Sequence, residues 1–324
     1  MNKLVIGLAA FTLPAIALAQ DEPEVAPSPN QIVADASADE WVAIKAQDLL
    51  VMTLAPDADG EPREVILQLM PAPFSQGWVE NIRTLARAEW YDGISVNRVQ
   101  DNYVVQWGDP GHDNPESGEV ETKPLPEGLN VMDEGDYSAP LHTDDPEQEL
   151  PAGISIDPYA ERAFFVEGFP FGISQEHHKA WPVHCYGMVG VGRNYSPDTG
   201  SGAELYTVIG HAPRHLDRNI ALVGRIISGM EHLSSMTRGT GALGFYTEEE
   251  VGLRTAILSI RVAADLPTNE QPQYEYLASD SASFDAYADA RANRRDPFFI
   301  VPAGGADICN IPVPIRAVAE TAAE

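Results

Sequence analysis

The stretch "EVILQLMPAPFSQGWVENIRTLARAEWYDGISVNRVQDNYVVQWGD", residues 64–109, contains the patterns that decide the fold. Residues 64–70 form a short apolar run bounded by turn residues, which is typical of a β-strand. Residues 75–90 repeat apolar side chains at helical spacing behind a serine, which predicts one amphipathic helix. Residues 91–109 then predict two short strands around a tight turn.

Arg98 lies in the middle of the first of these two strands. If the turn is centred on Asn102, Arg98 stands opposite Gln106, and Val104 shares their face of the hairpin. A guanidinium and an amide on an otherwise apolar face form a polar pair that a peptide group could approach. The alternative is a structural salt bridge at the rim of the sheet.

The remaining apolar runs predict a fold that is mainly β. Residues 49–55 and 64–70 flank a turn-rich segment and predict a hairpin. Further short runs bounded by turn residues are "AFFVEGF" (163–169), "HCYGMVGVGR" (184–193), "AELYTVIG" (203–210), "NIALVGRIISGMEHLSSM" (219–236) and "GLRTAILSIRVAA" (252–264). Many short strands and few helices indicate a β-barrel or a β-sandwich, and no fixed repeat is visible.

An acidic segment at about 110–160 interrupts this pattern. Residues 109–161 hold 15 acidic residues, eight prolines and a single basic residue, Lys123. We interpret this segment as a solvated loop insertion with little apolar area to bury. A calcium site or a docking patch is the alternative, although the carboxylates lack the glycine-punctuated spacing of a calcium loop.

The two ends of the chain differ from the middle. Residues 1–19 resemble a secretory signal peptide cut after Ala19, with an uncleaved membrane anchor as the alternative. Residues 20–40 are acidic and proline-rich and are expected to form a flexible leader. Residues 266–324 are treated as a C-terminal extension, with a helix at 281–295 and a possible strand at "FFIVP", 298–302.

Charge and cysteine content restrict the function. The formal net charge of −29 would repel a polyanion, so nucleic-acid binding is excluded. An exported protein could join Cys185 to Cys309 in a disulfide, but the sequence leaves their pairing open.

Known catalytic and metal-binding motifs are mostly missing. The sequence has no Gly-x-Ser-x-Gly elbow, no phosphate-binding Gly-Lys loop and no dinucleotide fingerprint after a strand. The histidines of "HHKAWPVH" (177–184) and "HAPRH" (211–215) lack the spacing of a metal site, so we expect no metal and no cofactor.

Two blocks resemble the cyclophilin family of peptidyl-prolyl isomerases. The first is residues 64–109 with its "YDG…R…Q.GD" pattern, and the second, at about 184–236, contains a methionine strand, a Gly-Ser loop, an aromatic strand and a strand ending in Gly-Arg. The resemblance implies a closed eight-stranded β-barrel with two helices spanning residues 41–265, interrupted by the acidic insertion.

Carried over residue by residue, the resemblance implies a complete site. Arg98 takes the place of the catalytic arginine, and Gln106 takes that of the glutamine that binds a substrate carbonyl. The proline pocket would be formed by Tyr103, Val104, Tyr206, Leu216 and Ile220.

The second block departs from the family pattern at several positions. Ile220 replaces a histidine, Glu204 a glutamine and Leu205 an aromatic residue. Arg214 and His215 precede Leu216, where a tryptophan is expected.

The expected function is therefore an exported, periplasmic or secreted peptidyl-prolyl cis-trans isomerase (EC 5.2.1.8) acting on proline-containing polypeptides. One alternative is a chaperone or scaffold of the same fold that binds proline-containing peptides without isomerising them. The other is a structural envelope protein that docks through the acidic insertion. The clients and the oligomeric state do not follow from the sequence.

Overall fold

A computed structural model describes residues 26–113, 121–140, 157–174 and 176–318. The expected signal peptide and its cleavage site lie outside these residues. None of the helices in the described ranges combines the length and apolar character needed to cross a membrane.

Eight antiparallel strands form the main sheet, in the order β13-β2-β3-β12-β10-β11-β5-β4. These strands are β2 (Leu49–Leu54), β3 (Arg63–Leu69), β4 (Ser95–Val99), β5 (Val104–Gly108), β10 (Met188–Val191), β11 (Glu204–Val208), β12 (Leu222–Ser228) and β13 (Ile257–Val262). Each comes from one of the apolar runs identified in the sequence.

The two edge strands of this sheet, β4 and β13, meet and close it. Ser95 forms an isolated antiparallel bridge with Ala256. The amide of Ile257 donates a hydrogen bond to Ile94 O at 2.7 Å, and the amide of Val96 donates one to Thr255 O at 2.9 Å. The sheet is therefore an eight-stranded barrel, as expected, because pairing its edges satisfies backbone groups that would otherwise stay open.

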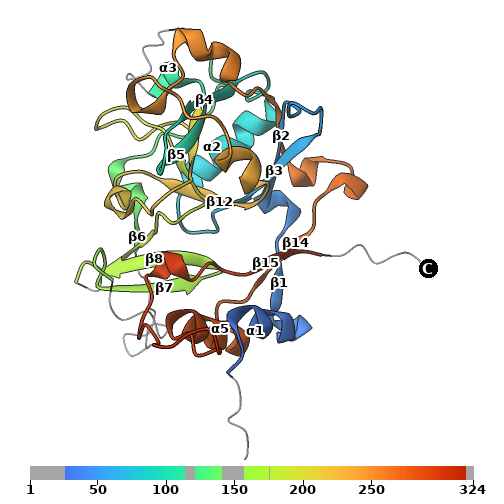
Figure 1. The fold of residues 1–324 in the computed structure, drawn as a ribbon. Helices are drawn as coiled ribbons and strands as arrows, with labels where there is room; N and C mark the ends of the chain where they lie inside the picture. Colours follow the sequence, from blue (N-terminus) through green and yellow to red (C-terminus); the bar gives the residue numbers. More distant parts are fainter. Residues whose placement is uncertain (1–25, 114–120, 141–156, 175, 319–324) are drawn as a thin grey trace, which may run out of the picture.

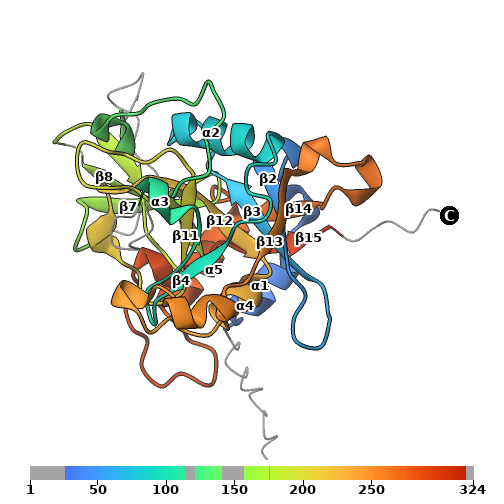
Figure 2. The same cartoon turned by 90° about the horizontal axis from the view of Figure 1, so that it is seen from above.

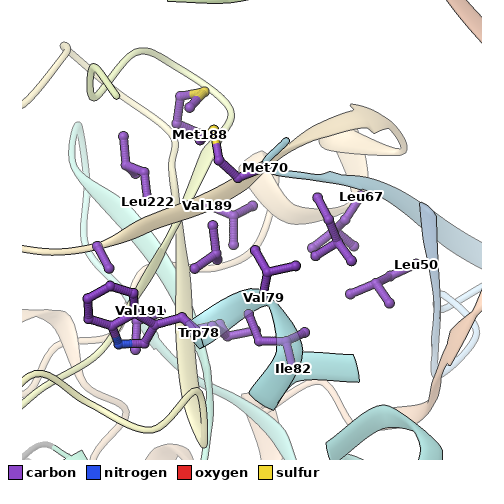
Figure 3. Close-up of a cluster of buried hydrophobic side chains, with 14 of the residues drawn as sticks. Leu50, Leu67, Met70, Trp78, Val79, Ile82, Met188, Val189, Val191 and Leu222 are labelled. Atoms are coloured by element: carbon purple, nitrogen blue, oxygen red, sulfur yellow. The ribbon is translucent and has the colours of Figure 1, made fainter. Parts of the chain in front are cut away.

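Two helices accompany the barrel, α2 (Gln76–Arg87) and the short α4 (Met230–Ser234). The predicted amphipathic face of α2 is buried, with Trp78 and Leu85 fully enclosed. Figure 3 shows Trp78 and Ile82 of α2 among core side chains that include Val191 of β10.

A second sheet of four strands was not expected from the sequence. It runs β6-β9-β8-β7, from β6 (Ala139–Pro140), β7 (Arg162–Val166), β8 (Phe169–Ser174) and β9 (Lys179–Pro182). The run "AFFVEGF" therefore belongs to this sheet and not to the barrel. Its turn residues Glu167 and Gly168 have φ values of 47° and 75°, which a tight two-residue hairpin turn requires.

The described part of the acidic segment packs on the barrel, which corrects the expectation that it buries little. Tyr137 is 6% exposed and stacks on Trp78, with the ring centroids 5.6 Å apart. The side chain of Asn81 in α2 accepts from the amide of Asn130 at 2.7 Å and donates to Asn130 O at 3.0 Å. A few apolar residues thus anchor a segment whose composition is otherwise polar.

The N-terminal leader was expected to be flexible, but its described part packs against the C-terminal extension. Residues 29–35 of the expected flexible leader form α1 (Pro29–Asp35), capped by Ser28, and α1 contacts α5 (Ala282–Ala292). Phe284 and Tyr287, which were predicted to share one face of α5, are buried. Figure 1 shows α1 and α5 side by side at the end of the molecule opposite the barrel.

A third sheet joins the two chain ends, in the order β1-β14-β15. It consists of β1 (Trp41–Ala43), β14 (Tyr274–Leu277) and β15 (Ile315–Ala317). The barrel therefore begins at β2, after the expected boundary at residue 41. The prediction of a strand at 298–302 is wrong, because these residues form no strand and Phe298 is 84% exposed.

Short helical turns complete the described chain. They are α3 (Pro110–Asp113) and the 3-10 turns Ala38–Glu40, Ala46–Asp48, Glu134–Tyr137, Arg214–Leu216, Ala242–Gly244, Glu248–Leu253, Ala263–Asp265, Thr268–Glu270 and Ile308–Asn310. A disulfide joins Cys185 to Cys309 and fixes the extension to the loop before β10. Figure 2 shows the same arrangement seen from above.

Candidate active site

Arg98 and Gln106 face each other across the hairpin of β4 and β5, as the sequence predicted. They are register partners, and Arg98 Nη1 donates to Gln106 Oε1 at 2.9 Å. Asn102 takes the turn position with a φ of 51°, a conformation that asparagine tolerates better than most residues. Both side chains are largely buried, so the guanidinium is held in one orientation.

Arg98 also contacts Tyr103, which was predicted, and Gln100, Leu243 and Phe245, which the sequence did not single out. Arg98 Nε donates to Leu243 O at 2.7 Å, and Nη2 donates to Gln100 Oε1. The guanidinium carbon lies 5.6 Å from the centroid of the Tyr103 ring and 5.3 Å from that of Phe245. Leu243 and Phe245 lie 145 and 147 residues after Arg98 in the sequence, so no local pattern could predict these contacts.

All seven predicted site residues line one pocket of about 320 Å³. They are Arg98, Tyr103, Val104, Gln106, Tyr206, Leu216 and Ile220, joined in the lining by Gln100, Gly192, Arg193 and Leu243. The structure therefore brings the predicted set together, while the role of each residue stays a prediction.

The pairing of β5 with β11 builds the floor of this pocket. Tyr206 is the register partner of Gln106, and Val208 is that of Val104. Val104, Tyr206 and Val208 form a buried apolar cluster, against which Tyr103 and Ile220 pack. The floor is apolar except for the phenol groups, and Arg98 and Gln106 supply polar groups beside it.

Behind this floor lies a buried polar network that sequence reasoning missed. Tyr206 Oη lies 2.9 Å from His184 Nε2, and His184 Nδ1 lies 2.9 Å from Asp217 Oδ1. A side chain at Gly190 would overlap the Tyr206 ring, so glycine leaves the space that the phenol occupies. In the sequence His184 was considered only as a metal ligand, and nothing in its local pattern pointed to Asp217, 33 residues away.

Arg214, noted as a departure from the family, extends this network. It donates through Nε to Asp217 Oδ2 at 2.7 Å and through both terminal nitrogens to Asp157 at 2.8 and 2.9 Å. The side chains of all three residues are 2% exposed. These hydrogen bonds satisfy the donors of Arg214 and hold the 3-10 turn Arg214–Leu216 in place.

Burial sets the protonation of the network. Desolvation lowers the pKa of His184, although the hydrogen bond from its Nδ1 to Asp217 opposes that shift. The ring is therefore neutral at pH 7, with Nδ1–H donating to Asp217 and Nε2 accepting from Tyr206. Burial also raises the pKa of Tyr206 well above its ordinary value, so the phenol keeps its proton.

The other departures lie at or behind the pocket. Glu204 is fully buried, and its Oε1 accepts from Asn97 Nδ2 at 3.3 Å. Leu205 is 1% exposed, whereas Ile220 packs directly on the apolar cluster of the pocket floor. Leu216 reaches the pocket, while His215 is absent from its lining.

The histidines considered for a metal do not assemble one. Across the described ranges, no three or more His, Cys, Asp or Glu side chains are grouped so as to share an ion. His184 is instead committed to Asp217 and Tyr206.

The chain is similar to several known proteins. A family model described as cyclophilin type peptidyl-prolyl cis-trans isomerase/CLD matches residues 77–257. The crystal structure of cyclophilin AquaCyp293 from Hirschia baltica is 19% identical, with a TM-score of 0.59, over 89% of this chain and 96% of that chain. A cyclophilin-type isomerase from Cryptosporidium parvum is 12% identical, with a TM-score of 0.38, over 66% of this chain and 96% of that chain.

No curated protein sequence matches the chain. The family model spans more than half of the chain, and the solved structure from Hirschia baltica shares its fold. This chain therefore belongs to the cyclophilin-type family of peptidyl-prolyl cis-trans isomerases, enzymes of class EC 5.2.1.8 that accelerate rotation about X-Pro peptide bonds.

Proposed function

We propose that this protein accelerates cis-trans isomerisation of X-Pro bonds in exported polypeptides. The proline ring binds in the pocket formed by Tyr103, Val104, Tyr206, Leu216 and Ile220, and Arg98 stabilises the twisted amide of the transition state. The observation that carries the proposal is the position of Arg98. Its guanidinium lines the same pocket as the apolar cluster and is tied to Gln106 at 2.9 Å.

The chemistry needs no nucleophile. Rotation about the X-Pro bond loses amide resonance, against a barrier of about 18–20 kcal/mol. In the twisted transition state the lone pair localises on the prolyl nitrogen, where a fixed donor stabilises it more than it stabilises the planar ground state. Arg98 would supply that donor, and Gln106 would orient the substrate carbonyl.

The test compares isomerase activity on a short Ala-Pro peptide, by protease-coupled or NMR exchange assay, in the wild type, Arg98→Ala and Arg98→Lys. Loss of one fixed donor is expected to lower the rate by about 10² to 10³ in Arg98→Ala, with only partial recovery in Arg98→Lys. The control is Arg238→Ala, since Arg238 is partly exposed and pairs with Asp101 outside the pocket. Full activity in folded Arg98→Ala would defeat the assignment, and an inactive wild type would favour the peptide-binding scaffold.

Export is part of the proposal and rests on residues 1–19 of the sequence alone. If the signal is cleaved after Ala19, the intact mass of the protein recovered from the periplasm starts at Gln20. Recovery of a soluble protein that retains Met1 would contradict the cleavage.

A further inference from the structure

A second cavity, larger than the proline pocket, lies where the C-terminal extension meets the barrel. Its volume is about 460 Å³, and it shares no lining residue with the proline pocket. Strand β12, the loop before β10 and the segment at 308–315 form most of its wall. Tyr186, which is 53% exposed, lies on this wall and places the mouth of the cavity at the surface.

Most of the wall is apolar. It includes Phe165, Met188, Ile226, Ile308, Ile311 and Val313. Cavities of this size, mostly apolar and with few polar groups, are typical of small-molecule sites, and they occur preferentially where two parts of a fold meet.

Arg225 is the buried charged group in this wall. It is 7% exposed, and its guanidinium stacks 4.3 Å from the centroid of the Phe169 ring. Nε and Nη2 donate to Gln68 Oε1 at 2.9 and 2.7 Å, and Nη1 donates to Gly168 O at 2.6 Å. These partners are all neutral.

Among the described residues, no carboxylate forms an ion pair with Arg225, and the only electrostatic partner that favours its charged form is the phenol of Tyr276. Burial lowers the pKa of Arg225 to about 9, which still leaves it charged at pH 7. A buried cation without a counter-charge carries a large desolvation cost, and an anion brought beside it would offset part of that cost. The other charged side chains of the lining, Glu231 and Arg291, are more exposed than Arg225.

We propose that this cavity binds a small monocarboxylate with an apolar tail, of the fatty-acid class, whose carboxylate pairs with Arg225 while the tail contacts the apolar wall. A neutral apolar molecule would leave the charge of Arg225 uncompensated. A phosphate ion would pair with the charge but would leave the apolar wall without a partner. The guanidinium of Arg225 has five N–H donors, of which the hydrogen bonds to Gln68 and Gly168 use three, so a carboxylate can accept from the remaining two.

The test is isothermal titration of the full chain with sodium dodecanoate below its micelle-forming concentration. Dodecanoate is expected to bind to the wild type. The control ligands are acetate, which lacks the apolar tail, and dodecanol, which lacks the charge. Both should bind at least tenfold more weakly than dodecanoate. Arg225→Met keeps an apolar stem but removes the charge, and it should weaken dodecanoate binding at least tenfold.

Two further variants keep the test decisive. Val313→Trp fills the cavity from its wall with Arg225 retained, so it should abolish binding even if Arg225→Met fails to fold. Arg98→Ala removes the arginine of the other pocket and should bind dodecanoate as the wild type does, while Arg225→Met should keep wild-type isomerase activity. Absence of binding to the wild type, unchanged affinity in folded Arg225→Met or in Val313→Trp, or loss of binding in Arg98→Ala would overturn the proposal.

Discussion

Tyr206 Oη lies 2.9 Å from His184 Nε2, so a side chain that lines the proline pocket is tied to a fully buried histidine. The two rings lie nearly parallel, 11° apart, which fixes the orientation of the Tyr206 ring. The hydroxyl of Tyr206 therefore has a structural role that a phenylalanine could not perform.

Replacing Tyr206 by phenylalanine is expected to destabilise the fold by about 1–3 kcal/mol, because His184 Nε2 would be left buried without a donor. Chemical denaturation measures this change. Tyr103→Phe is the matched control, since the Tyr103 phenol is perturbed by burial and by the charge of Arg98 but by no hydrogen bond to a described residue, and it should change stability by less than about 0.5 kcal/mol. Equal effects of the two substitutions would show that the His184 contact contributes nothing.

The lowered pKa of His184 predicts a loss of stability in mild acid. Below the ordinary pKa of 6.5 the unfolded chain binds a proton that the folded histidine does not, so the free energy of unfolding falls as the pH falls. In His184→Gln the slope of stability against pH between about 6.5 and 5 should be smaller than in the wild type. Unfolding curves at several pH values give both slopes, and identical slopes would contradict the prediction.

The contact between Tyr137 and Trp78 predicts that the acidic segment contributes to stability. Tyr137→Ala should destabilise the protein by about 3 kcal/mol, because it removes a buried aromatic ring from the core. Val131, in the same segment, is 97% exposed, so Val131→Ala should be within about 0.5 kcal/mol of the wild type. Thermal unfolding of both variants decides whether this segment packs or is dispensable.

The disulfide between Cys185 and Cys309 closes a loop with a sequence separation of 124 residues. Its removal in Cys185→Ala/Cys309→Ala should lower the free energy of unfolding by about 2–5 kcal/mol, chiefly by freeing the unfolded chain. A reductant should lower the melting temperature of the wild type and leave that of the double variant unchanged. A wild type indifferent to reductant under unfolding conditions would argue against the bond.

The sequence by itself determined the hairpin that carries Arg98. Alternating side chains set which residues share a face, and Asn102 set the turn, so the opposition of Arg98 and Gln106 followed from local chemistry. The helix at α2 was predicted for the same reason, because its apolar spacing is contained in a dozen residues. Val104 was placed on the same face by the register of the hairpin, whereas Tyr103, Tyr206, Leu216 and Ile220 came from resemblance to the family.

Only the tertiary structure decided the contacts between distant segments. The placement of Tyr137 on Trp78, of α1 on α5, and of Cys309 beside Cys185 joins parts of the chain whose own patterns carry no sign of a partner. The His184–Tyr206 contact and the uncompensated charge of Arg225 likewise depend on how strands and loops pack around them. Local periodicity fixes which face of an element is apolar, but the partner of that face, and the burial of a charge, are set by the closure of the whole chain.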